Sequence, residues 1–162
     1  MTMAGDTRRE PPRGGGIAFL LAQIGAQAAT LFAERVAALH LTPPQAGLLR
    51  AITRQAGESQ QWFAKRLGVP PSRFVQLVDS VEQRGLVERR RRPTDRRAYG
   101  LYLTDAGEEL MKELGKVGRA HEEDITRGLS AEQRAALHEA LTHIADGLGL
   151  TPEVHPGYRQ LR

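Results

Sequence analysis

Six arginines surround a single carboxylate in one short stretch, and this cluster is the part of the chain best suited to bind a negatively charged partner. Residues 86–104 read LVERRRRPTDRRAYGLYLT. Guanidinium groups bind phosphates and carboxylates through paired hydrogen bonds. Between Arg84 and Arg97, seven arginines stand against two acidic residues, a local excess of +5, whereas the whole chain has a net charge of +4. The basic charge is therefore concentrated on one surface.

The residues around this cluster predict a β-hairpin with the arginines at its tip. Leu86 and Val87 are apolar and begin the first strand. Tyr99, Leu101 and Leu103 recur at every second position in the second strand, which places them on one face. Such a hairpin would extend the arginines toward an anionic partner.

A helix-turn-helix is predicted immediately before the hairpin. Gly68, four residues after Ala64, supplies the positive φ of a tight turn, and the small Ala64 side chain lets the next helix cross closely. That helix begins at Pro70-Pro71 and ends at Gly85. Its outward face carries Ser72, Arg73 and Gln76. A helix-turn-helix followed by a basic hairpin is a winged helix, an arrangement that mostly binds duplex DNA.

Apolar helices are predicted on both sides of this unit. The run from Ile17 to Leu39 has helical spacing and only two charged residues, so we expect it to be buried on more than one side, with a partner subunit covering the second side. Capping boxes at Thr42–Gln45 and at Ser130–Gln133 predict two further helix starts. The chain therefore reads as mainly helical.

Composition narrows the class of protein. The chain has 162 residues, 40% of them hydrophobic, which suits one soluble domain with additional helices. It has no cysteine, which excludes disulfides and thiolate chemistry. Arg8-Arg9 precedes the apolar run as in a twin-arginine export signal, but prolines and glycines follow the pair. The glutamines and charges of the run disfavour a membrane span. We expect a cytoplasmic protein without a membrane partner.

No catalytic group of residues is evident in the sequence. It lacks a phosphate-binding glycine loop, a nucleophile elbow and a zinc-binding helix with paired histidines. The five histidines are scattered. We expect neither enzymatic activity nor a metal or other cofactor.

Several of these motifs occur together in a fixed order, and the combination resembles the MarR family of bacterial transcription regulators. The motifs are Thr42-Pro43-x-Gln45, Ala64-x3-Gly68, Val78-Asp79-x-Val81-Glu82-x2-Gly85-Leu86-Val87-x-Arg89, Pro93-x-Asp95-Arg96-Arg97 and Leu103-Thr104-x2-Gly107. The resemblance covers roughly residues 17–147, and its most specific part runs from residue 79 to residue 107.

The resemblance implies a mainly α fold with a small β-hairpin wing, that is, a winged helix-turn-helix flanked by N- and C-terminal dimerisation helices. It also implies a homodimer bound to double-stranded DNA. The expected divisions are a disordered N-terminal tail at 1–16, a dimerisation helix at 17–40, the DNA-binding domain at 41–104, C-terminal dimerisation helices at 105–148 and a C-terminal tail at 149–162.

The resemblance also assigns roles to single residues. Ser72, Arg73 and Gln76 match exposed positions of the recognition helix, and arginine and glutamine can pair with guanine and adenine. In the wing, Arg89 matches an arginine near the DNA backbone, and Arg97 matches one that enters the minor groove. Asp95 matches a carboxylate that orients the wing arginines. The remaining expected wing contacts are Arg90, Arg91, Arg92 and Arg96.

Two positions depart from the family pattern. Pro70 stands where relatives often carry a side chain that caps the recognition helix, so this cap is missing. Trp62 stands at a position that is usually polar, and we interpret it as a partly buried packing residue.

The family typically responds to small aromatic or phenolic effectors, which implies a pocket between the dimerisation helices and the winged helix. His40, Arg50 and Arg54 are the candidates for contacts with an anionic effector. The expected function is that of a repressor released from a pseudo-palindromic operator. Two alternatives remain open: an architectural DNA-binding protein with little sequence specificity, and a helical protein–protein module that no longer binds DNA.

Overall fold

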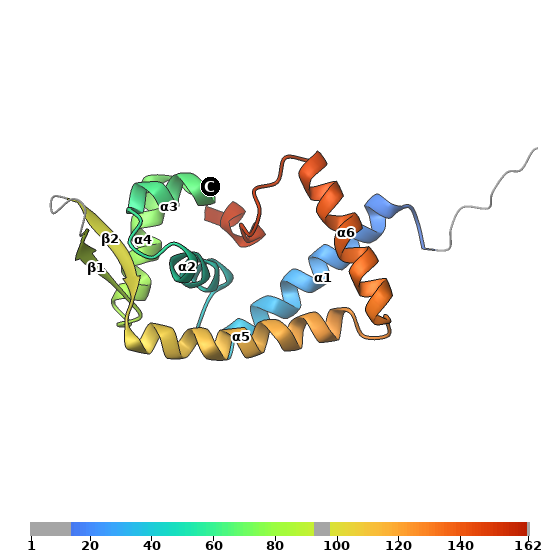
Figure 1. The fold of residues 1–162 in the computed structure, drawn as a ribbon, viewed down its shortest axis with the longest axis horizontal. Helices are drawn as coiled ribbons and strands as arrows, with labels where there is room; N and C mark the ends of the chain where they lie inside the picture. Colours follow the sequence, from blue (N-terminus) through green and yellow to red (C-terminus); the bar gives the residue numbers. More distant parts are fainter. Residues whose placement is uncertain (1–13, 93–97, 162) are drawn as a thin grey trace, which may run out of the picture.

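The computed structural model describes residues 14–92 and 98–161 as a mainly helical chain with one β-hairpin (Figure 1). The elements are α1 (Ile17–Ala37), α2 (Pro43–Arg54), α3 (Gln60–Leu67), α4 (Pro71–Glu82), β1 (Val87–Arg91), β2 (Tyr99–Leu103), α5 (Asp105–Ile125), α6 (Ala131–Gly147) and the short 3-10 helix η1 (Pro156–Leu161). The expected fold class is confirmed. Most of the expected N-terminal tail lies outside the described residues.

Helices α2, α3 and α4 and the hairpin enclose the main hydrophobic core, and we call this unit the winged domain. The rings of Phe63 and Phe74 stack at its centre with their centroids 6.4 Å apart. Burying an apolar side chain of this size contributes about 1.5–3 kcal/mol. The other fully buried side chains of the winged domain are Leu48, Leu49, Ile52, Val78, Val81, Val87 and Leu101.

The turn between α3 and α4 has the predicted geometry. Gly68 ends α3 in the left-handed region, with φ of 66°, and Ala64 is buried against the next helix. The N–H of Val69 donates to the carbonyl of Ala64 at 3.0 Å. This tight connection fixes the angle at which α4 leaves α3.

The hairpin pairs β1 with β2 from Val87 opposite Leu103 to Arg91 opposite Tyr99. The α2–α3 loop adds a short third edge, because the N–H of Leu101 donates to the carbonyl of Glu58 at 3.1 Å. Leu101 is buried, whereas Tyr99 is exposed despite the predicted apolar face. The reason is that this end of the hairpin extends beyond the core.

The helix starts predicted from capping boxes are confirmed at α2 and at α6. In each, a hydroxyl accepts from the N–H three residues later, and the glutamine there accepts from the backbone of the capping residue. Helix α5 begins at Thr104, whose side chain accepts from Gly107. These caps fix where three of the long helices begin.

Helix α1 packs on α5 only near its C-terminal end, where Val36 is buried and Arg35 pairs with Asp124. The rest of α1 is exposed, and so is the apolar face of α6. By length and composition alone α1 also meets the criterion for a membrane-spanning helix. Its polar residues therefore do not exclude a membrane span, which the sequence had led us to disfavour. The exposed large apolar residues of the two helices are Ile17, Phe19, Leu20, Leu21, Ile24, Leu137, Leu141 and Ile144.

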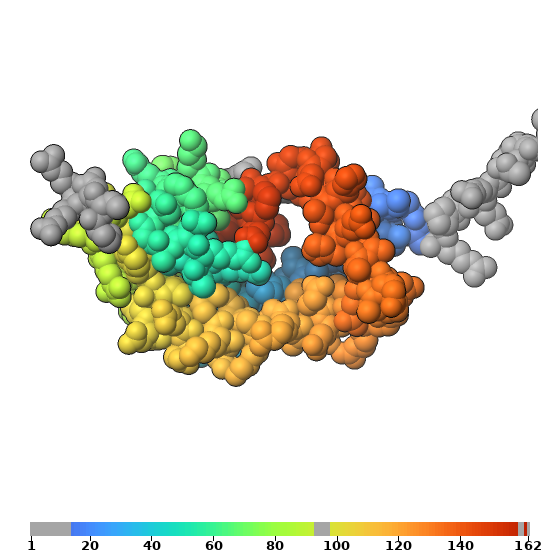
Figure 2. Space-filling model, viewed as in Figure 1, coloured from blue at the N-terminus to red at the C-terminus, as the bar shows by residue number. Residues whose placement is uncertain are grey.

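Residues 149–161, which we call the C-terminal segment, return from α6 to the winged domain instead of trailing away as the expected tail. Tyr158 is only 3% exposed and packs beside Gly47 of α2. The apolar ring of this tyrosine is the physical reason for the return, because the core of the winged domain covers it. Figure 2 shows that the chain consequently surrounds a hollow between α5, α6 and this segment.

Candidate nucleic-acid interface

The outward face of α4 presents the three recognition-helix candidates to solvent. Ser72, Arg73 and Gln76 are all exposed. They are held there because the opposite face of the helix is buried in the core through Phe74, Leu77, Val78 and Val81. A helix fixed on one face and polar on the other can enter a major groove without disturbing the domain.

Val75 is a further exposed residue of this face that the sequence reasoning did not single out. Its side chain is 42% exposed, between Arg73 and Gln76 in the chain. An apolar side chain at such a position can contact the methyl group of thymine. Helical phase alone could have identified it, because residue 75 does not fall on the buried stripe.

The first turn of α4 lacks a side-chain cap, as the proline at position 70 led us to expect. Pro70 precedes the helix without a capping hydrogen bond, and Pro71 occupies the first turn. The N–H groups of Ser72 and Arg73 therefore point out of the helix end. Free N–H groups at a helix N-terminus favour an anion such as a phosphate.

The described part of the wing arranges its arginines over aromatic rings and carboxylates. The guanidinium of Arg90 pairs with Glu88 and lies 5.2 Å from the ring centroid of Tyr102. The guanidinium of Arg91 lies 5.7 Å from the centroid of Tyr99. The hydrogen bond that Arg90 donates to Glu88, together with the charge of that carboxylate, raises the pKa of Arg90.

The tip of the wing, residues 93–97, lies outside the described residues. It includes Asp95, Arg96 and Arg97, so the expected minor-groove arginine and its orienting carboxylate stay predictions. Arg92, just before the tip, lies 3.4 Å from the carboxylate of Glu58. The part of the wing next to its tip is thus tied to the α2–α3 loop.

Arg89 connects the wing to the recognition helix. Its Nε donates to Gln60 of α3 at 2.9 Å, and its terminal nitrogens donate to Asp79, at 2.6 Å, and to Glu82 of α4. Only 23% of the side chain is exposed. The structure therefore gives Arg89 the role of bracing β1 against α4, while a contact with the DNA backbone stays a prediction.

Replacing Arg89 with methionine is expected to lower the free energy of unfolding by about 1–2 kcal/mol, because three hydrogen bonds from a charged guanidinium are lost. Urea unfolding followed by circular dichroism measures this, and amide exchange in β1 should accelerate. Arg90→Met is the matched control and should leave stability nearly unchanged, since Arg90 is mostly exposed and, among the described residues, contacts only Glu88 and the ring of Tyr102 within the hairpin. Equal effects of both substitutions would contradict the bracing role.

The effector candidates divide into a pair and an isolated residue. Arg50 and Arg54 together line two cavities on α2. One, of about 500 Å³, lies against α5 and Arg119, and the other, of about 240 Å³, lies against α3 and the C-terminal segment. His40 lies at the end of α1 and lines neither of them; its carbonyl instead accepts from Arg84.

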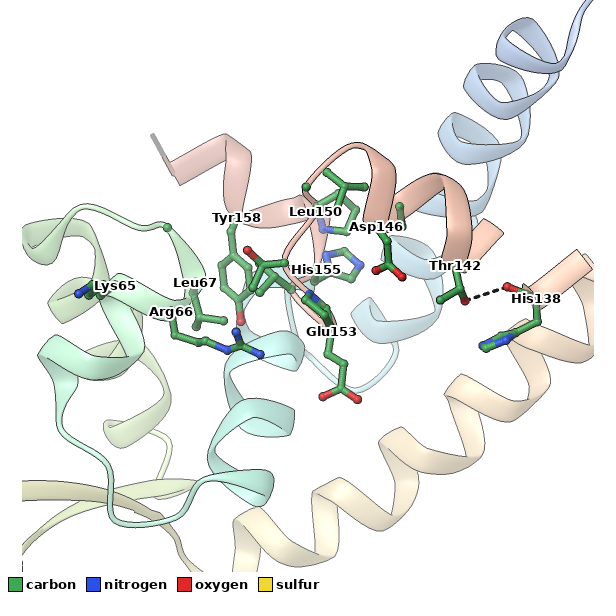
Figure 3. Close-up of a pocket in the computed structure, with 17 residues that line it drawn as sticks. Lys65, Arg66, Leu67, His138, Thr142, Asp146, Leu150, Glu153, His155 and Tyr158 are labelled. Carbon is green, nitrogen blue, oxygen red and sulfur yellow. Dashed lines mark hydrogen bonds between the residues drawn. The ribbon is translucent and has the colours of Figure 1, made fainter. Parts of the chain in front are cut away.

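The C-terminal segment also borders a larger cavity, of about 720 Å³, between α3 and α6 (Figure 3). His155 and Tyr158 enter it from the segment, and Arg66 enters it from α3. Burial and the charge of Arg50 hold the pKa of His155 below its usual value. The pKa of His121 on α5 is also lowered, by burial and by the charge of Arg35. The rings of His121 and His155 both contact the ring of Phe32.

Acidification is expected to destabilise this packing. Because the folded-state pKa of His155 is lower than in the unfolded chain, its contribution to stability is complete above pH about 6.5 and is lost as the pH falls through the folded-state value. Thermal unfolding at pH 7.5 and pH 5.5 measures the loss. A His155→Gln variant should show a smaller difference between the two conditions, and an identical difference would remove His155 from the titrating groups.

Comparisons with known proteins show similarity over the winged domain described above. A family model described as MarR family matches residues 40–98. The chain is 32% identical, over 97 residues, to a candidate transcriptional regulatory protein for the hcr operon of Thauera aromatica, a match that covers 60% of this chain and 58% of that protein. The chain thus spans less than two thirds of this curated relative.

Two solved structures are similar over most of the chain. The transcriptional repressor CouR bound to a 23-mer DNA duplex is 33% identical with a TM-score of 0.70, covering 80% of this chain and 92% of that one. CouR from Rhodococcus jostii RHA1 bound to p-coumaroyl-CoA is 28% identical with a TM-score of 0.68, covering 80% and 91%.

Proposed function

This chain belongs to the MarR family of transcriptional regulators, and on that premise we propose that it is a dimeric, sequence-specific repressor released from its operator by a small aromatic effector. The observation that carries the proposal is the outward face of α4. There, Arg73 and Gln76 are exposed beside an arginine-rich wing. The similar repressor CouR is bound to a DNA duplex in its solved structure, which supports the same partner for this chain.

Two copies of the chain are proposed to associate through α1, α5 and α6. The support is the row of exposed apolar residues on α1 and α6, which is costly to leave in water. None of the α6 residues is buried within one protomer. Covering these faces gives an interface of the obligate class, on the order of 2,000 Å² or more.

A dimer of this kind carries two copies of α4, and its operator is accordingly pseudo-palindromic. The two helices read half-sites about one helical turn apart. Arg73 pairs with guanine or with a phosphate, Gln76 pairs with adenine, and Val75 contacts a thymine methyl group. The uncapped N–H groups at the start of α4 bind a phosphate. The wing arginines contribute affinity and position rather than base recognition.

The effector is proposed to bind at Arg50 and Arg54 of α2, which line two cavities at the edge of the winged domain. Guanidinium groups in a cavity favour an anionic ligand. The structure of CouR with p-coumaroyl-CoA supports an aromatic, negatively charged compound. Coupling of about 1–3 kcal/mol between the two sites would lower operator affinity by about 5- to 150-fold.

A footprint on the promoter of the protein's own gene tests this function. We expect one protected, pseudo-palindromic site, bound about 10³-fold or more tightly than unrelated duplex DNA of equal length. Equal competition by unrelated DNA would instead identify an architectural protein with little sequence specificity. Repeating the footprint with phenolic acids tests the effector response separately.

A further inference from the structure

Three arginines line one cavity of the winged domain, and a carboxylate of the C-terminal segment lies among them. The cavity, of about 240 Å³, is bounded by α2, α3 and residues 152–154. Arg50 and Arg54 enter it from α2, Arg66 enters it from the end of α3, and Glu153 enters it from the segment. One negative charge therefore faces three positive charges.

The pairing inside this cavity is incomplete. Arg54 forms an ion pair with Glu153. Within the described part of the chain, Arg50 and Arg66 have neither an ion pair nor a hydrogen bond from their side chains. Clustered guanidinium groups repel one another, and a further anion with several acceptor oxygens would relieve this repulsion.

Glu153 occupies this place at a cost in backbone conformation. Its φ is 65°, in the left-handed region that favours glycine. A non-glycine residue persists there only where its surroundings hold it. Tyr158, anchored in the winged domain, supplies that constraint: a Cβ added to Gly47 would lie 2.6 Å from its hydroxyl oxygen, so no side chain fits between them.

The packing of Tyr158 on the winged domain leaves one polar group without a partner, which suits a contact that can be released. The hydroxyl of Tyr158 is buried and has no hydrogen-bond partner in the described residues. Figure 3 shows Tyr158 reaching from the segment toward Arg66 and Leu67 at the end of α3, while the Glu153 side chain points in a different direction. A buried hydroxyl without a partner weakens docking. The segment is thus held by an aromatic ring and one ion pair.

The walls of the cavity indicate which anion fits. Trp62, Leu67 and Val154 contribute apolar surface beside the arginines. The indole of Trp62 is held edge-on against Phe63, with ring centroids 5.1 Å apart, and is therefore a fixed wall. The volume lies just below the usual range of small-molecule sites, which suits a ligand with a single ring.

We propose that this cavity binds a small aromatic carboxylate and that Glu153 is an internal ligand which such an acid displaces. The inference rests on the effector response proposed above and assigns it a cavity, a ligand class and a competitor. The exchange replaces one carboxylate by another, and the incoming carboxylate is not tied to the backbone, so it can also pair with Arg50 and Arg66, which Glu153 leaves unpaired. Because both Glu153 and Arg54 are about half exposed, at 53% and 41%, their ion pair is weak enough to be exchanged.

Displacement of Glu153 has a consequence for the whole molecule. The C-terminal segment is the connection by which α6 reaches α2 and α3 (Figure 1). Releasing it frees the winged domain from one of its attachments to α6. Occupancy of the cavity thereby changes how firmly the two recognition helices of a dimer are spaced.

The experiment uses Trp62, the only tryptophan of the chain, as the reporter. The full-length protein is titrated with 4-hydroxybenzoate and, in parallel, with its neutral methyl ester, and tryptophan fluorescence is followed. We expect the acid to change the fluorescence saturably and the ester to have little effect. Glu153→Gln, which removes the competing charge and keeps the size, should tighten binding of the acid by about 2- to 5-fold.

Arg66→Gln should weaken binding of the acid by about 10-fold or more, because a charge-assisted hydrogen bond is lost. Arg127→Gln, which changes an exposed arginine in the turn between α5 and α6 away from the cavity, is the matched control and should bind like the native protein. Equal binding of acid and ester, or an unchanged affinity in either Glu153→Gln or Arg66→Gln, would overturn the proposal.

The titration contains no DNA, so its failure is distinguishable from failure of the proposed function. Saturable binding of the acid without any effect on the operator complex keeps the site and removes the effector response. A variant whose cavity no longer binds the acid could still release the operator when the acid is added. That result keeps the effector response, places the effector at another site and overturns the proposal for this cavity.

Discussion

Replacing Arg73 with alanine is expected to lower operator affinity by about 30- to 20,000-fold at constant salt. Arg73 is exposed in the first turn of α4, on the face opposite the buried core. A bidentate contact between arginine and guanine is worth about 1–3 kcal/mol. A dimer makes this contact twice, so the loss is about 2–6 kcal/mol. Fluorescence anisotropy with the footprinted operator duplex measures it.

The comparison with unrelated DNA identifies what Arg73 contacts. A base contact lowers affinity for the operator far more than affinity for a scrambled duplex. A phosphate contact lowers both equally and reduces the salt slope by about 1 for each subunit. Gln76→Ala should relax preference at a single base position of each half-site. Arg127→Ala, in the turn between α5 and α6, is the control that should leave DNA binding unchanged. Native affinity in Arg73→Ala would remove it from the interface.

Replacing Gly107 with alanine is expected to lower the free energy of unfolding by about 2–4 kcal/mol. A Cβ at this position would lie 2.1 Å from the carbonyl oxygen of Leu86, a distance that forces the backbone to move. That carbonyl also accepts from the N–H of Thr104, and the N–H of Gly107 donates to the Thr104 hydroxyl, both at 3.1 Å. A shift of the backbone at Leu86 or at Gly107 therefore disturbs the cap of α5.

Gly118 provides the matched control for this substitution, because it lies in the same helix and no neighbouring atom lies within 4 Å of its added Cβ. Gly118→Ala should raise stability by about 0.5–1 kcal/mol, since alanine favours a helix more than glycine does. Urea midpoints are compared at equal protomer concentration, because the stability of a dimer depends on it. Loss of stability in Gly118→Ala but not in Gly107→Ala would refute the steric argument.

The winged domain could be predicted from the sequence because its signals are local. A positive φ at Gly68, the capping box that opens α2, and the buried stripe of α4 each depend on residues within one or two helical turns. The exposure of Ser72, Arg73 and Gln76 follows from the same periodicity. The family resemblance then added the partner and the assembly that such a domain serves.

The role of Arg89 shows where local signals end. In the sequence it is one of four consecutive arginines, and the family resemblance predicts only a contact near the DNA backbone for it. In the structure Arg89 points to Asp79 and Glu82, whereas Arg90 pairs with its own strand neighbour. The difference arises because alternate strand residues face opposite sides, and only the packing of β1 on α4 decides which side holds the carboxylates.

By itself the sequence determined the helices, the turn, the hairpin and the face of α4 that can meet DNA, because backbone conformation, capping and periodicity act over a few residues. Only the tertiary structure decided that the C-terminal segment returns to the winged domain and that Glu153 meets Arg54. Contacts between residues so distant in the chain depend on which surfaces the fold leaves uncovered. The ring of Tyr158 packs on such a surface beside Gly47. This packing places the carboxylate of Glu153 next to the arginines of α2.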